Sequence, residues 1–299
     1  MNWISRIKEE ASIRIFRDDI YPFLGGGNKG RKMDFIGKEI LSDKYDSVVT
    51  TGGIQSNHCR AVAVFAAQNR LECSLVLHGD KERFEKESGN TKIIRLSGAE
   101  ILFSEAKDIG SNMDLCMQEY RNKGMKPYYI YGGGHTHAGG LAYIEAVKNL
   151  KEYSDKNKWC PDYIFLASGT GSTQAGIMAG LDKYNFDSTK VIGISVARNR
   201  QRAEKVVESF YKELCEVYKI KSTNRQTIVL DDYLCGGYEK YNVAIKEISD
   251  NSINKYGFTL DTCYTAKAFY GMKEYIKNNN IKGEILFWHT GGIFNFLAQ

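Results

Sequence analysis

The stretch DSVVTTGGIQSNHCRAVAVFAAQNR, residues 46–70, decides the fold class that we expect for this chain. Its first part, 46–52, is a short β-branched run that predicts a buried strand. Its second part, 56–70, is a longer alanine-rich stretch that predicts a helix, with Ser56 as the N-cap. A strand that runs directly into a helix is typical of a parallel sheet, because parallel strands need such connections.

The same alternation continues along the rest of the chain. Further strands are predicted at 73–79, 99–105, 127–133, 162–168, 191–197 and 284–289. Further helices are predicted at 89–98, 110–124, 172–181 and 200–218. Strands that alternate with helices predict an α/β fold, in which helices cover both faces of parallel sheets.

Two glycine-rich segments, at 25–30 and 132–140, divide this pattern. We interpret them as hinges around an inserted block. The expected organisation is a small α/β domain, residues 35–134, set into a large discontinuous domain formed by 1–34 and 135–299.

Composition excludes several classes of protein. The chain has 299 residues, 42% of them hydrophobic, and a net charge of +5 from 41 cations and 36 anions. This small surplus is dispersed, without the basic stripe of a nucleic-acid binder. No apolar run is long enough to span a bilayer, and the charged N-terminus lacks the apolar core of a signal peptide. We therefore expect a cytoplasmic protein without membrane or nucleic-acid partners.

The cysteine and histidine patterns give no sign of a disulfide framework or a metal centre. The seven cysteines are odd in number and contain no C-x-x-C pair. The segment HTH, residues 135–137, places two imidazoles at strand-like spacing, but no third ligand lies nearby in the sequence. We therefore expect no bound metal.

The segment SGTGST, residues 168–173, lies between a predicted strand and a predicted helix. Backbone N–H groups of a glycine-rich turn bind phosphate together with the positive end of a helix, and hydroxyl groups add donors. The alternative is a tight turn that binds nothing. The expected phosphate-binding residues are Ser168, Gly169, Thr170, Gly171, Ser172 and Thr173.

Neither common nucleotide fingerprint is complete in this chain. Gln174 stands where the dinucleotide pattern needs its third glycine, and Arg31 stands where a P-loop starting at Gly25 needs lysine. An NADP site, with the 2′-phosphate on Arg198, remains an alternative.

The turn TTGGIQSNH, residues 50–58, precedes a predicted helix. The positive end of that helix favours an anion. We expect a carboxylate to bind there, with Gln55, Ser56, Asn57 and His58 as the candidate residues.

The segment LGGGNKGRKMDF, residues 24–35, places Lys29 directly after a glycine-rich loop. Together with a phosphate-binding turn and a carboxylate-binding turn, this lysine completes the set of groups that pyridoxal phosphate requires. The cofactor needs a phosphate anchor, a lysine for its Schiff base and a partner for its pyridine nitrogen.

Five motifs resemble one known family, and they occur in that family's order. They are GGGNKGRK (25–32), TTGGIQSNHCR (50–60), ASGTGSTQAG (167–176), YTAKAFYGM (264–272) and HTGG (289–292). Jointly they resemble the fold type II pyridoxal-phosphate enzymes, which have the tryptophan synthase β-like fold. Within that family they are most similar to the D-cysteine desulfhydrase and 1-aminocyclopropane-1-carboxylate deaminase group.

The resemblance implies roles for individual residues. Lys29 would carry the cofactor, and residues 169–173 would hold its phosphate. Ser56 and Asn57 would face the substrate and the ring hydroxyl. Tyr264 would lie against the ring, and Tyr238 near the substrate. We also expect a homodimer.

Two threonines bear on the choice of branch. The deaminase has an acidic and an apolar residue where this chain has Thr265 and Thr290. A hydroxyl beside the pyridine nitrogen would not keep it protonated, which favours β-elimination of a good leaving group. The expected reaction is the conversion of D-cysteine to pyruvate, sulfide and ammonia. The family's GYG turn is GYE here, at 237–239, so we expect an altered substrate pocket.

Several alternatives stay open at this stage. The chain could be a 1-aminocyclopropane-1-carboxylate deaminase, a sulfo-lyase or another lyase of the same family. Outside those activities it could be an NADP-dependent reductase or a silent cofactor-binding protein. Either Lys29 or Ser56 could take the α-proton. A lysine base needs its pKa lowered by burial or by a nearby cation, for which Arg31 and Lys32 are the candidates.

Overall fold

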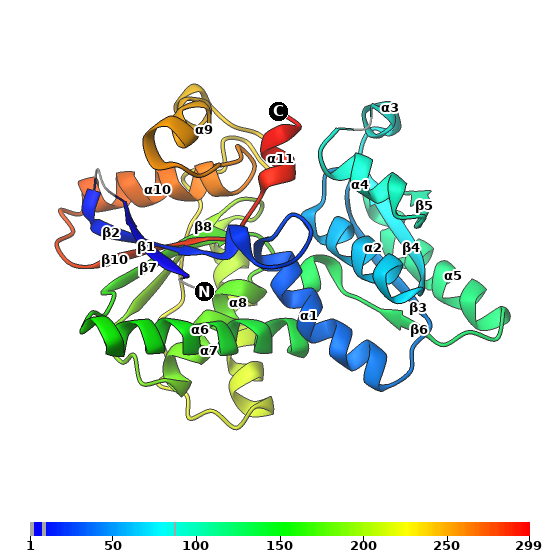
Figure 1. The fold of residues 1–299 in the computed structure, drawn as a ribbon, viewed down its shortest axis with the longest axis horizontal. Helices are drawn as coiled ribbons and strands as arrows, with labels where there is room; N and C mark the ends of the chain where they lie inside the picture. Colours follow the sequence, from blue (N-terminus) through cyan, green and yellow to red (C-terminus); the bar gives the residue numbers. More distant parts are fainter. Residues whose placement is uncertain (1–2, 8–9, 87) are drawn as a thin grey trace.

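The computed structural model describes residues 3–7, 10–86 and 88–299, which form two lobes around two separate sheets (Figure 1). The larger sheet has six strands in the order β1-β2-β10-β7-β8-β9, and the smaller has four in the order β5-β4-β3-β6. All neighbouring strands are parallel except β1 and β2. The predicted α/β fold with two parallel sheets is therefore confirmed, with one antiparallel strand at the edge of the larger sheet.

The strands of the larger sheet are β1 (Ile4–Ile7), β2 (Glu10–Arg17), β7 (Tyr163–Ser168), β8 (Lys190–Ser195), β9 (Ile228–Leu230) and β10 (Ile285–His289). Three of them match predicted strands, whereas β1, β2 and β9 were not predicted. Side chains alternate between the two faces of the sheet, as along β7, where Ile164 and Phe165 belong to different hydrophobic cores.

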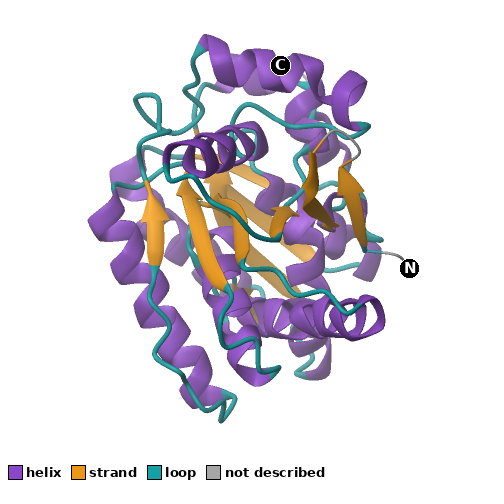
Figure 2. Cartoon of the chain, turned by 90° about the vertical axis from the view of Figure 1, so that its left-hand side faces the viewer, coloured by secondary structure: helices purple, strands orange, loops and turns teal. Residues whose placement is uncertain are grey.

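Helices cover both faces of the larger sheet (Figure 2). One layer is formed by α6 (His137–Asn157), α7 (Ser172–Lys183) and α8 (Arg200–Val217). The other is formed by α9 (Val243–Tyr256) and α10 (Thr265–Asn278). The long helix α6 was not predicted, because its first residues fall in the segment 132–140 that we interpreted as a hinge.

The smaller sheet comes from one continuous part of the chain. Its strands are β3 (Ser47–Gly53), β4 (Glu72–His78), β5 (Glu100–Phe103) and β6 (Pro127–Tyr129). The helices around it are α1 (Gly27–Ser42), α2 (Asn57–Asn69), α3 (Lys81–Glu85), α4 (Asn90–Leu96) and α5 (Ile109–Asn122). Helix α1 packs against both α2 and α6, so it joins the two lobes. The proposed domain boundaries at 34 and 134 stay a prediction.

The short C-terminal helix α11 (Ile293–Leu297) lies between the lobes (Figure 1). It follows the end of β10 directly. Its Asn295 donates to the backbone oxygen of Gln55 at 3.0 Å, so the end of the chain is bonded to the smaller lobe.

The structure places two of the sequence motifs at the starts of helices. The HTH segment lies at the start of α6, where Thr136 is the N-cap and accepts from the Gly139 N–H. Lys29 directly follows the glycine-rich loop, as expected, and lies in the first turn of α1, which begins at Gly27.

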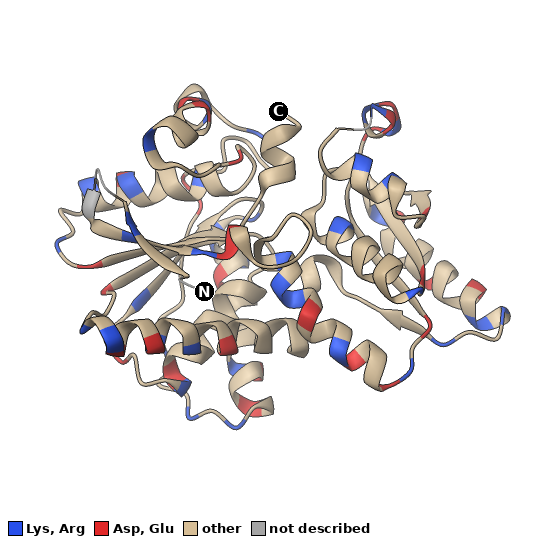
Figure 3. Ribbon diagram, in the orientation of Figure 1, with Lys and Arg blue, Asp and Glu red and all other residues tan. Residues whose placement is uncertain are grey.

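Charged side chains are spread over both lobes, with both signs interspersed along outer helices such as α5 and α6 (Figure 3). This agrees with the dispersed charge in the sequence. In the described ranges, no helix is both long and apolar enough to cross a bilayer.

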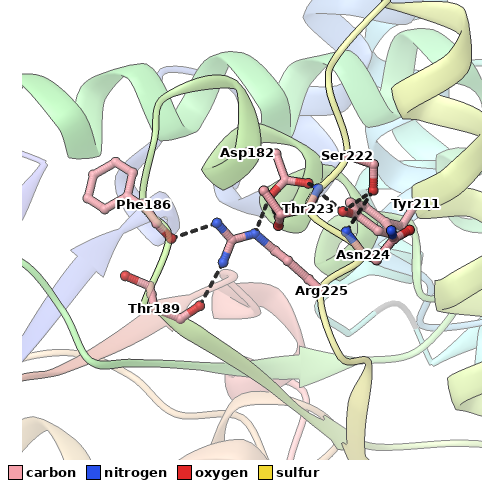
Figure 4. Close-up of polar contacts among 8 residues, drawn as sticks. All are labelled: Asp182, Phe186, Thr189, Tyr211, Ser222, Thr223, Asn224 and Arg225. Carbon is pink, nitrogen blue, oxygen red and sulfur yellow. Dashed lines mark hydrogen bonds and ion pairs between the residues drawn. The ribbon is translucent and has the colours of Figure 1, made fainter.

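A buried carboxylate fixes the connection that follows α8 (Figure 4). Asp182, at the end of α7, accepts from the hydroxyl group of Tyr211, from Thr223 Oγ1 at 2.7 Å, and from Arg225 Nε. Arg225 also donates to the carbonyl oxygens of Thr189 and Phe186, at 2.9 and 2.6 Å. The loop before β9 is therefore bonded to two helices of the larger lobe.

We expect Asp182→Ala to lower the free energy of unfolding by about 3–5 kcal/mol, because it leaves the buried Arg225 cation without its partner. Denaturant unfolding measures the loss. The matched control is Asp250→Ala, which breaks the exposed Lys246–Asp250 pair on α9 and should cost about 0.5 kcal/mol. Equal losses in the two variants would contradict a structural role for the buried pair.

Candidate active site

A cavity of about 420 Å³ is lined by residues of both lobes, at the carboxyl ends of β3, β7 and β10. This is the edge of a parallel sheet at which ligands are generally bound. Twelve of the predicted site residues line it: Lys29, Ser56, Asn57, His58, Ser168, Gly169, Thr170, Gly171, Thr173, Tyr238, Tyr264 and Thr290.

Three predicted residues do not line the cavity, because their side chains are bonded elsewhere. Gln55 donates to the Ser88 carbonyl oxygen at 2.9 Å. Ser172 accepts from Lys32 Nζ at 2.7 Å. Thr265 donates to the carboxylate of Asp261 at 2.7 Å. The structure therefore does not bring these three side chains into the cavity, although the Ser172 backbone still begins α7.

Lys29 extends from the first turn of α1 into the cavity. Its Nζ donates to the backbone oxygen of Gly133 at 2.9 Å. Burial lowers the pKa of its ammonium to about 8. A substantial fraction of this amine is therefore neutral near pH 8, as a nucleophile or base requires.

Arg31 is not the cation that lowers the Lys29 pKa. It is buried and bonded to Asp18, with 2.7 Å between Arg31 Nε and Asp18 Oδ1. Lys32 is also buried, and its pKa is held well below the ordinary value by burial and by the neighbouring Lys29 charge. The pKa of Lys29 is therefore lowered by its own burial, which removes the ammonium group from water.

The helix that carries Lys29 is fixed to the larger sheet through Asp18. This fully buried carboxylate also accepts from the Tyr143 hydroxyl of α6 and from Trp288 Nε1 of β10, the latter at 3.1 Å. The Arg31–Asp18 pair thereby connects α1 to two elements of the larger lobe. Arg31 lies two residues after Lys29 on the same helix. The Arg31–Asp18 pair therefore fixes the part of α1 that carries Lys29.

The turn at 168–173 has the geometry of an anion site. Gly171 is the N-cap of α7, at φ 87°, and provides no side chain to cap the helix. The first N–H groups of α7 have no partner within the helix and are free for a ligand. Thr170 and Thr173 add hydroxyl groups to the cavity wall. Arg198, which also lines the cavity, donates to the Gly169 carbonyl oxygen at 2.6 Å and thereby supports the turn.

The start of α2 forms a second part of the wall. Ser56 Oγ accepts from the Cys59 N–H at 3.2 Å, so the predicted N-cap is confirmed. The His58 ring bonds to Thr50 Oγ1 at 2.9 Å, and burial together with the Lys29 charge holds its pKa well below the ordinary value. His58 is therefore neutral and already paired, which leaves Ser56 and Asn57 to face a ligand.

Two tyrosines close the cavity from the larger lobe. The hydroxyl groups of Tyr238 and Tyr264 are hydrogen-bonded to each other. Burial raises the pKa of both phenols well above the ordinary value, so both stay protonated at neutral pH. Lys267 donates to the Leu234 and Gly237 carbonyl oxygens, at 3.1 and 3.0 Å, and thus holds the loop that carries Tyr238.

The departure from the family pattern at Glu239 has a partner in the smaller lobe. Glu239 adopts φ 61°, in the left-handed region that favours glycine. Its carboxylate forms an ion pair with Arg83 of α3, at 3.3 Å. The loop beside Tyr238 is thereby connected to the opposite lobe.

Other lining residues were not singled out from the sequence. They include Asn28, Thr51, His78, Gly133 and Gly291. His78 ends β4 and Gly133 follows β6, so the rule that ligands lie at the carboxyl ends of parallel strands could have indicated both. Asn28 donates to Thr173 Oγ1 at 3.1 Å and connects the lysine helix to the anion turn.

The charge of the wall favours an anionic ligand. No Asp or Glu occurs among the described residues that line the cavity, whereas Lys29 and Arg198 do.

The two imidazoles of the HTH segment are bonded to protein atoms, His135 to the Thr170 carbonyl oxygen and His137 to Glu213. Across the described ranges, no group of three or more His, Cys, Asp or Glu could hold a metal ion.

This chain is similar to known proteins in sequence and in fold. Residues 3–291 match the family described as pyridoxal-phosphate dependent enzyme. The "Putative 1-aminocyclopropane-1-carboxylate deaminase" of Pyrococcus horikoshii is 33% identical, over 95% of this chain and 85% of its own length. The D-cysteine desulfhydrase of Salmonella typhi is 31% identical, over 98% and 90% of the two chains.

The fold of this chain is also similar to that of solved structures. The crystal structure of an ACC deaminase homologue has a TM-score of 0.87 and 30% identity, and covers 95% of this chain and 86% of that one. A threonine deaminase from T.th. has a TM-score of 0.64 at 13% identity, over 94% and 87% of the two chains, which shows a shared fold alone. The predictions of the fold type II architecture and of pyridoxal phosphate as the cofactor are therefore confirmed. The chain belongs to the pyridoxal-phosphate dependent enzyme family, as a lyase of the 1-aminocyclopropane-1-carboxylate deaminase and D-cysteine desulfhydrase group.

Proposed function

We propose that this cavity binds pyridoxal phosphate at Lys29 and catalyses α,β-elimination on a small β-substituted amino acid, with D-cysteine as the leading candidate. With one water molecule consumed, the products from D-cysteine would be pyruvate, sulfide and ammonia. One observation carries the proposal: a buried lysine with a pKa lowered to about 8 shares a cavity with an anion-binding turn and no described acidic side chain. Relatives named D-cysteine desulfhydrase support the choice of substrate.

The residues present fit the cofactor. The free N–H groups at the start of α7, with Thr170 and Thr173, would hold a phosphate. A Cβ added at Gly133 would lie 2.7 Å from the Thr170 side chain and 3.4 Å from Lys29 Nζ, so glycine leaves the space between these groups open. When bound, the cofactor supplies an electron sink for the α-carbon of an amino acid.

The substrate carboxylate would bind at the start of α2. Ser56 and Asn57 face the cavity there, next to the positive end of the helix. Gln55 and His58 would act by supporting the turn, since their polar atoms are bonded to Ser88, Asn90 and Thr50.

Lys29 is better suited than Ser56 to take the α-proton. Its Nζ is buried and partly neutral near pH 8. Within the described residues, the bonds to the Ser56 side chain come from the Cys59 N–H and the Cys59 thiol. Burial raises the pKa of that thiol to about 12, so it is no base that could activate the hydroxyl group.

The tyrosine pair would serve the leaving group. Tyr238 and Tyr264 stay protonated, so a hydroxyl group of the pair can donate a proton or hydrogen bond to a departing sulfur atom. Their mutual hydrogen bond holds both rings at the cavity wall.

Thr290 is the residue of the threonine pair that faces the cavity. Thr265 is instead bonded to the buried Asp261. Because no described acidic side chain lines the wall, the ring nitrogen of the cofactor would not be held protonated. This favours elimination of a good leaving group over opening of a carbon ring, which has no heteroatom to leave.

We expect the purified holoenzyme to release pyruvate from D-cysteine and from β-chloro-D-alanine. The rate of 2-oxobutanoate formation from 1-aminocyclopropane-1-carboxylate should be at least about a hundredfold lower, because that reaction needs stronger stabilisation in its transition state. Both products are measured as 2-oxo acids, with L-cysteine, D-serine and a sulfonate analogue of cysteine in the same panel.

Efficient formation of 2-oxobutanoate by the wild-type protein would contradict the argument from Thr290. Absence of any 2-oxo acid from the whole panel would support a cofactor-binding protein without turnover. The family assignment leaves the NADP-dependent reductase without support, since Arg198 is bonded to Gly169 beside the anion turn.

A further inference from the structure

Two buried residues outside the cavity wall, Arg60 and Asn90, form a chain of hydrogen bonds that ends at Asn57. Arg60 Nε donates to Asn90 Oδ1 at 3.1 Å. Asn90 Nδ2 then donates to Asn57 Oδ1 at 3.0 Å. Arg60 is 1% exposed and Asn90 is fully buried, whereas Asn57 lines the cavity.

The direction of these bonds is fixed by chemistry. A guanidinium group only donates, so the oxygen of the Asn90 amide must face Arg60. Its nitrogen must therefore face the acceptors on the other side, which are the Gln55 carbonyl oxygen at 3.0 Å, Asn57 Oδ1 at 3.0 Å and Asn295 Oδ1 at 3.1 Å. These three oxygens share its two hydrogens. The oxygen of the Asn57 amide is consequently the atom that meets Asn90, and the Asn57 N–H group is left for the cavity.

Burial of the Arg60 cation costs free energy, which no ion pair in the described ranges offsets. Within the described part of the chain, no carboxylate pairs with this cation, and burial lowers its pKa to about 10. Its two terminal nitrogens each donate one bond, Nη1 to the Leu24 carbonyl oxygen and Nη2 to the Gly26 carbonyl oxygen, next to the helix of Lys29. A neutral side chain could fill this space, but it would not impose a direction on the Asn90 amide.

We propose that Arg60 and Asn90 are positioning residues that keep the Asn57 amide turned with its N–H group toward the cavity, where it donates to the ring oxygen of the bound cofactor. The proposal rests on the cofactor site of the proposed function. A donor at this position favours the ionised form of the ring oxygen and tightens cofactor binding.

The test compares two ligands on the Asn90→Asp variant of the full chain. The new carboxylate still accepts from Arg60 but cannot donate to Asn57, so the Asn57 amide loses its fixed direction. We measure the dissociation constants of pyridoxal phosphate and of 3-deoxypyridoxal phosphate, which lacks the ring oxygen. Binding of pyridoxal phosphate should weaken about tenfold or more, and binding of the deoxy analogue should change less than twofold.

Two controls distinguish the lost direction of the Asn57 amide from a general disruption of the site and from the added charge of the new carboxylate in the Asn90→Asp variant. Asn295→Ala removes another partner of Asn90, 3.1 Å from its Nδ2, and should affect both ligands equally. In an Asn57→Ala background, Asn90→Asp should cause no further difference between the ligands, because the residue through which it acts is gone.

Each outcome bears on the proposal. Equal weakening for both ligands, or no change for either, would overturn it and leave Asn90 a structural residue. If Asn90→Asp does not fold, Arg60→Gln replaces it, since glutamine can accept as well as donate and should again weaken pyridoxal phosphate more than the analogue. Failure of the wild-type protein to bind pyridoxal phosphate would instead reject the proposed function.

Discussion

Lys29→Ala is expected to abolish the visible absorbance of the bound cofactor and to lower the elimination rate at least about a thousandfold. The variant loses the amine that would hold the cofactor covalently and the group that would move the α-proton, and a positioned base alone contributes about 10²–10⁴ in rate. Absorbance spectra and pyruvate release measure the two losses on one sample. Borohydride reduction followed by peptide mapping should place the cofactor of the wild-type protein on Lys29.

The pH dependence of cofactor capture provides an internal control. Only the neutral amine reacts, so the capture rate of the wild-type protein should increase as pH rises through about 8, the lowered pKa of Lys29, and then level off. An exposed lysine would give the same increase only near its ordinary pKa of about 10.4. Attachment at Lys32 or Lys267 would show that the assignment to Lys29 is wrong.

Gly169→Asp is expected to weaken binding of pyridoxal phosphate about a hundredfold or more. A carboxylate at this position would stand in the turn proposed to bind the phosphate, and two like charges 4 Å apart repel by about 4 kcal/mol near a protein surface. Gly169 suits the test because a Cβ there meets only Val196, at 3.6 Å. Equilibrium dialysis or fluorescence titration measures the affinity.

The control for this variant is Gly169→Ala, which adds the Cβ without the charge and should bind within about threefold of the wild type. Gly171 is a poorer choice, because its φ of 87° and a Cβ distance of 2.8 Å from Val207 Cγ2 would add strain to the charge. Unchanged affinity in a folded Gly169→Asp protein would place the phosphate elsewhere.

Much of the fold followed from the sequence because its strands are buried on both faces. Runs such as 46–52 and 191–197 are rich in β-branched residues, and the structure has strands there within one or two residues. Strand β2 was missed because its apolar residues alternate with charged ones such as Arg14, and its neighbour β10 lies at the other end of the chain.

Helix α6 was missed for a different reason, which lies in its packing. A Cβ at Gly140 would lie 2.5 Å from Leu214 of α8, and a Cβ at Gly176 of α7 would lie 2.6 Å from the Gly140 carbonyl oxygen. These glycines allow three helices to approach closely. The sequence alone does not show which helices pack against these glycines, so the glycines of 132–140 were interpreted as a hinge.

The candidate site was predicted best where the backbone itself provides the chemistry. Turns at the ends of β3 and β7 follow from local sequence, and both contribute to the cavity. The direction in which a side chain points does not follow from local sequence. Gln55 and Thr265 turn away because Ser88 and Asp261 bind them, and Arg60 contacts Asn90 instead of lining the cavity.

The position of β10 has a consequence for the synthesis of this protein on the ribosome. This strand is synthesised after all the other described strands, yet it lies between β2 and β7 in the larger sheet. The strands of the smaller sheet, by contrast, lie within 47–129 and can pair while translation continues. Nascent chains therefore expose the unpaired edges of β2 and β7 until β10 has been synthesised, which makes them candidates for protection by a chaperone at the ribosome.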